Sequence, residues 1–294
     1  MADTITGILK RVNKLQFAVR SPDRSYRPGP VEVMVHPNLT QYFALTEGAA
    51  VTGQIQRTQG EPRLVSIESL GGMPPESFRE RPRFTDLVAI DPHERFDLGG
   101  CGQESMRIVD LIAPVGKGTR QLIVSPPKAG KTILLEQIVR AIHHCSPQSR
   151  IIALLVDERP EEVTHFRRAV EGAEVVASTN DHGADEHVEL AELMLAHVRI
   201  ELECGREVVL LIDSLTRLGR AFNNRIRGRS TPPAAHVRKL SSTVRSTAAA
   251  WPRFGVFCRT TSPDRPWTLC SSYSRRTLPT RSSWRICVPE TDRW

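Results

Sequence analysis

The chain has 294 residues, a length that suggests two domains and allows a sizeable buried core. Its formal charge of +7, from 40 Lys and Arg residues against 33 Asp and Glu residues, first suggests a nucleic-acid partner. The charge is uneven, however, because residues 225–294 hold 13 Arg and one Lys against three acidic residues. Residues 1–224 therefore carry a net charge of −4, and the basic excess belongs to the C-terminal segment alone.

Simple patterns exclude several classes of protein. The opening segment MADTITG contains an acidic residue and lacks the apolar core of a secretory signal peptide. The longest apolar runs, such as residues 151–156, are too short to span a bilayer. The six Cys residues form no C-x-x-C pair, which argues against a zinc site and against a disulfide framework. We therefore expect a protein of the reducing cytoplasm.

Residues 1–72 have the pattern of a small β-barrel. Short segments typical of strands are separated by turn signals, and they lie at residues 4–12, 14–20, 31–35, 50–56 and 64–67. Five short strands within so short a segment favour a barrel. In such a barrel Phe17 and Tyr26 are candidates for stacking on bases, but a core Phe and a loop Tyr are at least as good an interpretation.

From Gln121 onward, apolar strands alternate with helices. The expected strands lie at residues 121–124, 151–156, 174–178 and 208–212, and the expected helices lie at residues 132–144, 160–171 and 187–204. Continuous apolar strands that alternate with helices indicate a parallel sheet covered on both faces.

The segment SPPKAGKT, residues 125–132, matches the phosphate-binding pattern G-x-x-x-x-G-K-[ST] except that Ser125 replaces the first Gly. A strand precedes the segment and a helix follows it, so backbone N–H groups and a helix N-terminus would face phosphate oxygens. We expect Lys131 to contact the β- and γ-phosphates and the Thr132 hydroxyl to bind Mg²⁺. The alternative is a chance Gly-Lys-Thr at a helix start.

Acidic residues end two of the expected strands. Asp213 follows the apolar run VVLLI, where a Walker-B carboxylate holds Mg²⁺. Asp157 and Glu158 end the strand IIALLV, where a carboxylate can orient or deprotonate the water that attacks a γ-phosphate. The alternative is a charge cluster that caps the helix beginning at Pro160. Spacing alone leaves both interpretations open.

Together these residues resemble one family, the bacterial transcription termination factor Rho, a RecA-like hexameric RNA-dependent ATPase and helicase. The matching strings are IAPVGKGTRQLIVSPPKAGKT (112–132), LLVDERPEEVT (154–164), EVVAST (174–179) and LLIDSLTRLGRAFN (210–223). In the barrel region, SPDRSYRPGP and VEVMVHP look like the OB-fold RNA-binding domain of that family. The resemblance implies an incomplete α/β RecA-like P-loop ATPase domain preceded by an OB-fold barrel.

The resemblance also implies roles for individual residues around ATP and Mg²⁺. The implied nucleotide contacts are Gly116, Lys117, Gly118, Thr119, Arg120, Gln121, Lys128, Ala129, Gly130, Lys131, Thr132, Ile133 and Arg159. Glu158 would activate water and Asp213 would serve Mg²⁺. Arg217 would lie near the γ-phosphate and couple it to the neighbouring subunit.

For RNA, the resemblance implies contacts in the barrel, and they are Phe17, Arg20, Tyr26, Glu32, Glu61 and Arg63. The aromatic residues on which the family stacks RNA bases are replaced here, by Gln16, Ala18, Met34 and Arg63. Because stacking contributes about 1–3 kcal/mol per base, we expect weak affinity for C-rich single strands.

We divide the chain into an OB-fold-like RNA-binding domain (1–72), a linker (73–100), the N-terminal part of a RecA-like ATPase domain (101–224) and an aberrant basic tail (225–294). Leu, Ile, Val and Phe are scarce in the tail, so we expect it to be disordered or the product of a frameshift. A natural RNA-binding tail is the alternative.

The expected function is ATP-driven RNA translocation that terminates transcription. The expected partners are single-stranded RNA and the RNA polymerase transcription complex. A homohexamer is expected of the intact family, whereas this chain is not expected to close a ring. The alternatives are an ATPase that acts on other cargo and a nucleotide-binding fragment without turnover.

Overall fold

The computed structural model describes residues 3–14, 16–57, 62–87, 92–125 and 129–226, and the backbone of residues 254–260 and 285–287. Contacts divide the chain into a barrel unit (residues 1–87 and 188–206) and a sheet unit (residues 88–187 and 207–294). Each unit is described by itself. In the described part of the chain, no helix combines the length and the apolar character needed to cross a membrane.

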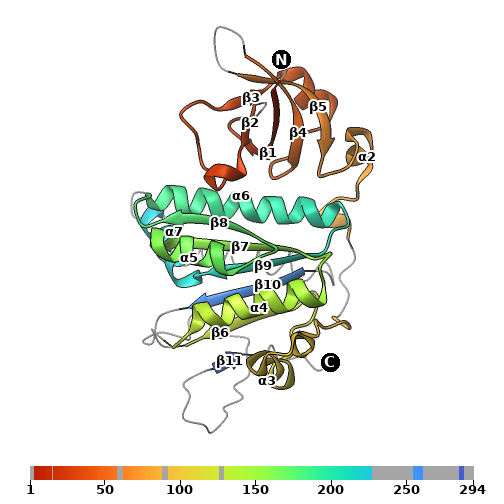
Figure 1. Cartoon of the computed structure of the whole chain (residues 1–294). Helices are drawn as coiled ribbons and strands as arrows, with labels where there is room; N and C mark the ends of the chain where they lie inside the picture. The colour runs from red at the N-terminus through yellow and green to blue at the C-terminus, as the bar shows by residue number, and fades with distance from the viewer. Residues whose placement is uncertain are drawn as a thin grey trace. The chain divides into compact units, whose positions relative to one another are not determined.

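The barrel unit contains a closed five-stranded barrel, as the strand pattern predicted (Figure 1). Its strands are β1 (Asp3–Arg11), β2 (Phe17–Arg20), β3 (Val33–Val35), β4 (Ala50–Gln56) and β5 (Arg63–Leu70). They close in the order β1-β2-β3-β5-β4, with β3 parallel to β5 and the other pairs antiparallel. A helix that sequence analysis did not predict, α1 (Pro37–Tyr42), lies between β3 and β4 in the chain.

Alternate residues of the strands fill the core of the barrel, as expected of strands with one buried face. The core includes Leu9, Val19, Val33, Val35, Val51 and Leu64. Helix α2 (Pro75–Glu80) adds Phe78, which is fully buried in the same core. The Pro- and Gly-rich composition predicted a linker over residues 73–100, but this buried aromatic side chain anchors the first part of that range to the barrel.

The sheet unit is built on a six-stranded sheet (Figure 1). Its strands are β6 (Arg120–Val124), β7 (Arg150–Glu158), β8 (Ala173–Thr179), β9 (Val208–Asp213), β10 (Phe254–Thr260) and β11 (Arg285–Cys287). The order is β11-β6-β10-β9-β7-β8, and every pair is parallel except β11 with β6. The predicted parallel sheet is therefore confirmed.

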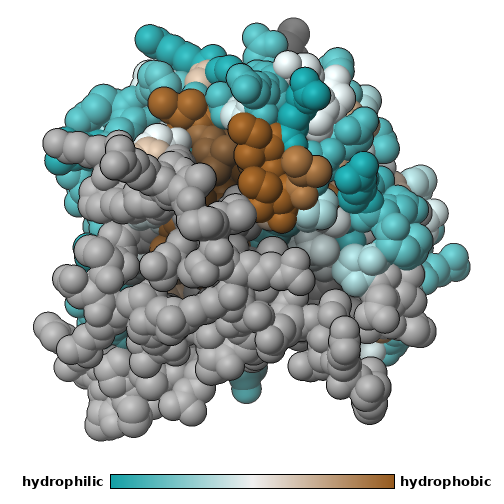
Figure 2. All heavy atoms as spheres, turned by 90° about the horizontal axis from the view of Figure 1, so that it is seen from below, coloured by the Kyte–Doolittle hydropathy of each residue, from teal (hydrophilic) through white to brown (hydrophobic). Residues whose placement is uncertain are grey.

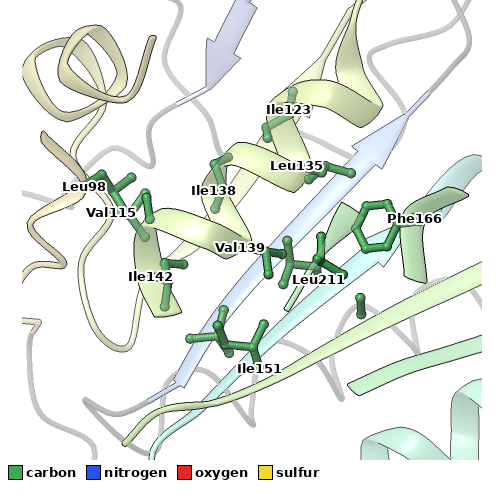
Figure 3. Close-up of a cluster of buried hydrophobic side chains, with 14 of the residues drawn as sticks. Leu98, Val115, Ile123, Leu135, Ile138, Val139, Ile142, Ile151, Phe166 and Leu211 are labelled. Carbon is green, nitrogen blue, oxygen red and sulfur yellow. The ribbon is translucent and has the colours of Figure 1, made fainter. Parts of the chain in front are cut away.

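The remaining helices are α3 (Glu104–Ile112), α4 (Lys131–Cys145), α5 (Pro160–Ala169), α6 (Ala184–Glu203) and α7 (Leu215–Ile226). Single turns of 3-10 helix occur at η1 (Pro22–Arg24), η2 (Phe84–Asp86) and η3 (Leu98–Cys101). Helices α4 and α5 pack over one face of the sheet, and Figure 3 shows their side chains meeting those of β6, β7 and β9. The labelled members of this core are Leu98, Val115, Ile123, Leu135, Ile138, Val139, Ile142, Ile151, Phe166 and Leu211.

Strands β10 and β11 lie in the range for which no regular structure was expected. In the structure β10 is a central strand, with β6 on one side and β9 on the other. The structure therefore differs from the prediction of a disordered tail at residues 254–260 and 285–287, which form strands. A low share of large apolar residues argues against independent folding, but a segment can still pair with two strands that are already in place. The rest of the basic tail, from residue 227 onward, lies outside the described residues.

Hydrophobic side chains also gather on the outside of the protein, on the face that Figure 2 shows from below. Helix α3 exposes three apolar side chains at helical spacing, Ile108, Leu111 and Ile112. The opposite side of α3 places Met106 and Val109 in the core of the sheet unit. Helix α3 therefore has apolar side chains on its exposed face as well as on its buried face.

Candidate nucleotide-binding site

Three chemically important segments meet at one edge of the parallel sheet, here called the carboxyl edge. Strand β6 ends at Val124 just before the glycine-lysine segment, β9 ends at Asp213, and β7 ends at Glu158. Strand β10 joins the first two in register, because Arg259 pairs with Asp213 on one side and with Ile123 on the other. The carboxyl ends of parallel strands are where open α/β sheets bind ligands.

The turn between β6 and α4 places a helix N-terminus at this edge. Gly130 precedes the helix with φ 79° and ψ 21°, a left-handed conformation that glycine adopts without steric cost. Lys131 follows and is 3% exposed, and the half-buried Thr132 lies in the same turn. The positive end of the helix dipole and the backbone N–H groups of this turn favour an anion. Of the predicted contacts here, Lys128 lies outside the described residues.

A β-bulge at the end of β7 sets the position of Glu158. Along the β7–β8 pair, Val156 pairs with Ser178 and Glu158 pairs with Thr179, so Asp157 is an extra residue on β7. Asp157 has a positive φ of 56°. Bulges of this kind bend the strand and change the direction of the next side chain, and they are common beside active sites.

The Glu158 carboxylate is buried among other charged groups. It is 2% exposed, and its Oε2 lies 3.2 Å from Nη1 of Arg217 on α7. The pKa of Glu158 is raised from 4.5 to about 8, mainly by burial and then by the carboxyl groups of Glu162 and Asp213. Arg217 acts in the opposite direction. A buried acid with a strongly shifted pKa beside like charges is characteristic of functional sites.

Asp213 and Arg159 complete the carboxyl edge. Asp213 is 3% exposed and ends β9, and the following Ser214 accepts a hydrogen bond from the backbone N–H of Arg217 (3.4 Å). Arg159 is exposed and precedes α5, next to Glu158. The described residues contain no group of three His, Cys, Asp or Glu side chains able to hold a metal ion alone. A carboxylate and a hydroxyl, Asp213 and Thr132, instead fit Mg²⁺, which keeps waters and takes phosphate oxygens.

The structure does not bring Gly116–Gln121 to this edge. The segment leads into β6, whose five residues at about 3.3 Å each separate its start from the phosphate turn by roughly 17 Å. It therefore lies at the opposite edge, here called the amino edge. A strand runs between this segment and Lys131, so the two do not meet within one chain in the way that was expected. The nucleotide contacts of Gly116–Gln121 stay a prediction.

Residues of the amino edge form ion pairs and hydrogen bonds with one another. Lys117 places its Nζ 3.0 Å from Glu207 and 3.3 Å from Glu94. Glu207 comes just before β9 and also accepts hydrogen bonds from Ser146 (3.3 Å) and Ser149. Within the predicted segment, Thr119 donates to the Gly116 carbonyl (2.6 Å), and the Gln121 amide donates to the Pro114 carbonyl (2.8 Å).

In the barrel, the two aromatic candidates are buried. Phe17 is 1% exposed and belongs to the hydrophobic core, and Tyr26 is 6% exposed. Neither ring presents a face on which a base can stack, so both predictions are corrected, and the core alternative for Phe17 is confirmed. Phe17 alternates with Val19 along β2, and both side chains share the core with Leu9 of β1.

The other predicted RNA contacts are charged. Arg20 is 8% exposed and lies with its Nη2 3.1 Å from Oε1 of Glu32, whereas Arg63 is exposed. Glu61 lies outside the described residues. On three neighbouring strands of the barrel, Ala18 of β2 pairs with Met34 of β3, and Met34 pairs with Arg63 of β5. Three of the positions at which aromatic residues are missing therefore form one row, and Ala18 in this row is fully buried.

Sequence reasoning missed several residues that shape the site. Glu162 lies in the first turn of α5, only four residues after the end of β7 at Glu158, and this closeness in the chain was the signal for its effect on the buried carboxylate. His187 and Ser178 lie beside Asp157 and carried no recognisable motif. Glu207 at the amino edge was likewise missed, because its partner Lys117 is 90 residues away in the chain.

Comparisons with known proteins agree with this geometry. Residues 105–237 match the ATP synthase alpha/beta family, nucleotide-binding domain. The chain is 41% identical over 256 residues to the transcription termination factor Rho of Streptomyces lividans, and 40% identical to those of Mycobacterium bovis (260 residues) and Aquifex aeolicus (256 residues). Each match covers 85% of this chain. The chain is a relative of transcription termination factor Rho.

The likeness to Rho is partial in length. The chain spans 35%, 41% and 57% of the three Rho proteins, in the same order. A solved ATPase from the type III secretion system of pathogenic bacteria shares the fold, with a TM-score of 0.51, 20% identity, and coverage of 73% of this chain and 60% of that one. The α/β P-loop ATPase fold preceded by a barrel is therefore established for this Rho relative.

Proposed function

We propose that this chain binds ATP with Mg²⁺ at the carboxyl edge and hydrolyses it as part of a Rho-type, RNA-dependent translocase that terminates transcription. One observation carries the proposal. The glycine-lysine turn after β6, Asp213 at the end of β9, and the buried Glu158 at the end of β7, which is paired with Arg217, all lie at the carboxyl edge of one sheet. The relatives named transcription termination factor Rho support the biological role.

In this proposal the turn before α4 binds the phosphates. Backbone N–H groups from Ala129 to Thr132 would face the phosphate oxygens, and Lys131 would add a positive charge against the β- and γ-phosphates. The exposed Ile133 lies in the first turn of the same helix and would flank the nucleotide. Asp213 and the Thr132 hydroxyl would hold Mg²⁺, which when bound neutralises charge on the phosphate oxygens.

Glu158 would accept a proton from the attacking water. A general base is most effective when its pKa lies near the working pH. Burial raises the pKa of Glu158 to about 8, which meets this condition. Arg217, 3.2 Å from the carboxylate, would orient it and would lie where charge develops on the γ-phosphate. Arg159 would be a further nucleotide contact beside Glu158.

RNA would be bound by the barrel through charge more than through stacking. The exposed Arg63 lies in a row with Met34 and Ala18, and the aromatic Phe17 and Tyr26 are buried. Backbone contacts made by arginine are strongly salt-dependent. We therefore expect weak binding of C-rich single strands that weakens further as salt is raised. The transcription complex of RNA polymerase and a homohexameric ring are partners by family likeness alone.

A second candidate function is ATP hydrolysis that RNA does not stimulate. The lack of an exposed aromatic residue in the row formed by Ala18, Met34 and Arg63 favours it. A nucleotide-binding fragment without turnover is a separate outcome of the test.

The test is MgATP hydrolysis by the full chain with and without poly(C), with Lys131→Ala as the control for contaminating activity. RNA-stimulated hydrolysis that disappears in Lys131→Ala supports the Rho-type function. Hydrolysis that RNA leaves unchanged supports the second candidate. Nucleotide binding without hydrolysis rules out both and leaves a binding fragment.

A further inference from the structure

A buried histidine lies directly beside the bulge that positions Glu158. His187 is 5% exposed and comes from the first turn of α6. Its Nδ1 lies 2.9 Å from the Oγ of Ser178 on β8, and its Nε2 lies 4.0 Å from Oδ1 of Asp157. The imidazole is therefore within hydrogen-bond distance of the neighbouring strand and lies against the extra residue of the bulge. Neither the phosphate turn nor the proposed Mg²⁺ ligands explain this arrangement.

Both residues beside the imidazole are anchored by strand pairing. Ser178 is fully buried and pairs with Val156, the last residue of β7 before the bulge. Asp157 follows with its positive φ, and Glu158 then rejoins the pairing with β8. A change in the conformation of Asp157 would therefore rotate the Glu158 side chain away from Arg217, because the two residues are adjacent.

The backbone of Glu158 is held by the same loop that leads to His187. The Asn180 N–H donates to the Glu158 carbonyl (3.1 Å), and the His187 N–H donates to the Gly183 carbonyl (3.2 Å). Between them, His182 Nδ1 accepts from the Thr179 N–H (2.9 Å). The loop thus binds the backbone at the end of β7 through Asn180, and the imidazole of His187 lies against the side chain of Asp157.

The chemistry of the ring suits this role. Burial is the largest influence and lowers the pKa of His187, while the nearby charge of Asp157 opposes the change. The other titratable groups around the ring are His182 and Glu186. A neutral imidazole has one N–H, and Asp157 can only accept. In the tautomer protonated at Nε2, Nδ1 accepts from the Ser178 hydroxyl and the N–H faces Asp157 at 4.0 Å, a polar contact longer than a hydrogen bond.

We propose that His187 is a positioning residue for Glu158: its imidazole holds Asp157 in the bulge conformation, and the bulge directs the Glu158 carboxylate to Arg217. The proposal rests on the proposed function, in which Glu158 activates water. It assigns His187 no contact with the nucleotide.

Three substitutions separate positioning from simple packing. His187→Gln keeps an N–H near the place of Nε2, toward Asp157. His187→Asn keeps a polar atom near the place of Nδ1, toward Ser178, but does not reach Asp157. His187→Ala removes both. The matched control is His144→Gln, at an exposed histidine near the end of α4.

The first measurement is MgATP hydrolysis by the full chain. We expect His187→Asn and His187→Ala to lower kcat about 10- to 100-fold, with KM for MgATP unchanged within about twofold, and His187→Gln to retain most of kcat. A purely structural histidine, held by its hydrogen bond to Ser178, would be replaced at least as well by Asn as by Gln. Equal kcat values for His187→Asn and His187→Gln would overturn the proposal.

The second measurement does not depend on turnover. Hydrogen exchange at the Asn180 amide reports the bond to the Glu158 carbonyl, and it should be faster in His187→Asn and His187→Ala than in His187→Gln and His144→Gln. If the unmodified chain does not hydrolyse ATP, the proposed function fails, and the exchange rates still decide the positioning role. Equal Asn180 exchange in all four variants would overturn it.

Discussion

The two edges of the sheet differ in how their charges are compensated. At the amino edge, Lys117 meets two carboxylates, and Glu207 meets one ammonium group and two hydroxyl groups. At the carboxyl edge, the buried Glu158 has other carboxyl groups among its neighbours, and its pKa is raised to about 8. The charges of the amino edge are compensated by partners in the same chain, whereas a desolvated acid with a raised pKa beside like charges is characteristic of functional sites.

Two glycine-lysine segments that are close in sequence have different surroundings at these two edges. Lys117 and Lys131 flank the same strand, because β6 runs between them and places them at opposite edges. Lys117 is tied to Glu207, just before β9, whereas Lys131 begins α4 at the phosphate turn. Proximity along the chain therefore says little about which edge a residue serves.

The largest expected effect concerns catalysis at the carboxyl edge. Glu158→Gln should lower the rate of ATP hydrolysis about 10²- to 10⁴-fold, because it removes the proton acceptor, while MgATP affinity changes little. The measurements are steady-state hydrolysis and equilibrium nucleotide binding. Glu161→Gln, at an exposed position in the first turn of α5, is the matched control. Hydrolysis at the unmodified rate in Glu158→Gln would remove Glu158 from the mechanism.

The next effect compares the two lysines directly. Lys131→Ala should weaken nucleotide binding roughly 10- to 100-fold, the value of a charge-assisted contact of about 1.5–3 kcal/mol. Lys117→Ala should leave the affinity unchanged within about twofold, because its side chain lies at the other edge. Titration with a fluorescent ATP analogue measures both. Equal losses in the two variants would contradict the separation of the edges.

A smaller effect is expected on stability. Lys117→Met should lower the free energy of unfolding by about 1–3 kcal/mol, because Glu207 loses its cation while remaining buried. Adding Glu207→Leu should restore part of that loss, since the double variant buries no uncompensated carboxylate. Urea unfolding measures both changes. If the double variant loses more unfolding free energy than the two single variants lose together, the network has another role.

The smallest effect is the pH dependence of the same ion pairs. Burial by itself would lower the pKa of Lys117, but hydrogen bonds and charges from Glu207 and Glu94 raise it above 10.5. The folded state then holds this proton more tightly than the unfolded state. The stabilisation is complete below pH 10.5 and declines as the pH rises through the folded pKa. Urea unfolding at pH 9.5 and 11 should show this decline in the unmodified protein and a smaller one in Lys117→Met.

Local sequence patterns were sufficient for the elements of the carboxyl edge. A strand, a glycine-lysine-threonine turn and a helix predicted the phosphate turn, and an acid after VVLLI predicted Asp213 at a strand end. These predictions depend on neighbours within a few residues. Parallel strands then bring their carboxyl ends together without further information.

Register and burial needed the tertiary structure. Strand pattern alone left Phe17 open as a base-stacking or core residue, and only the closed barrel, in which Phe17 shares a core with Leu9 and Val19, placed it inside. A shift of one residue moves every side chain of a strand to the other face. Strand β10 was missed for a related reason, because its place depends on two neighbours that are already aligned.

The sequence by itself determined that this protein has a small barrel, a parallel sheet and a glycine-lysine helix start after the first strand of that sheet, since each follows from a short local pattern. Only the tertiary structure decided which charges share an edge. It placed Gly116–Gln121 a strand's length away from Lys131, and it surrounded the Glu158 bulge with Ser178 and His187. The physical reason is that strands carry sequence neighbours apart, while pairing and packing bring distant residues together.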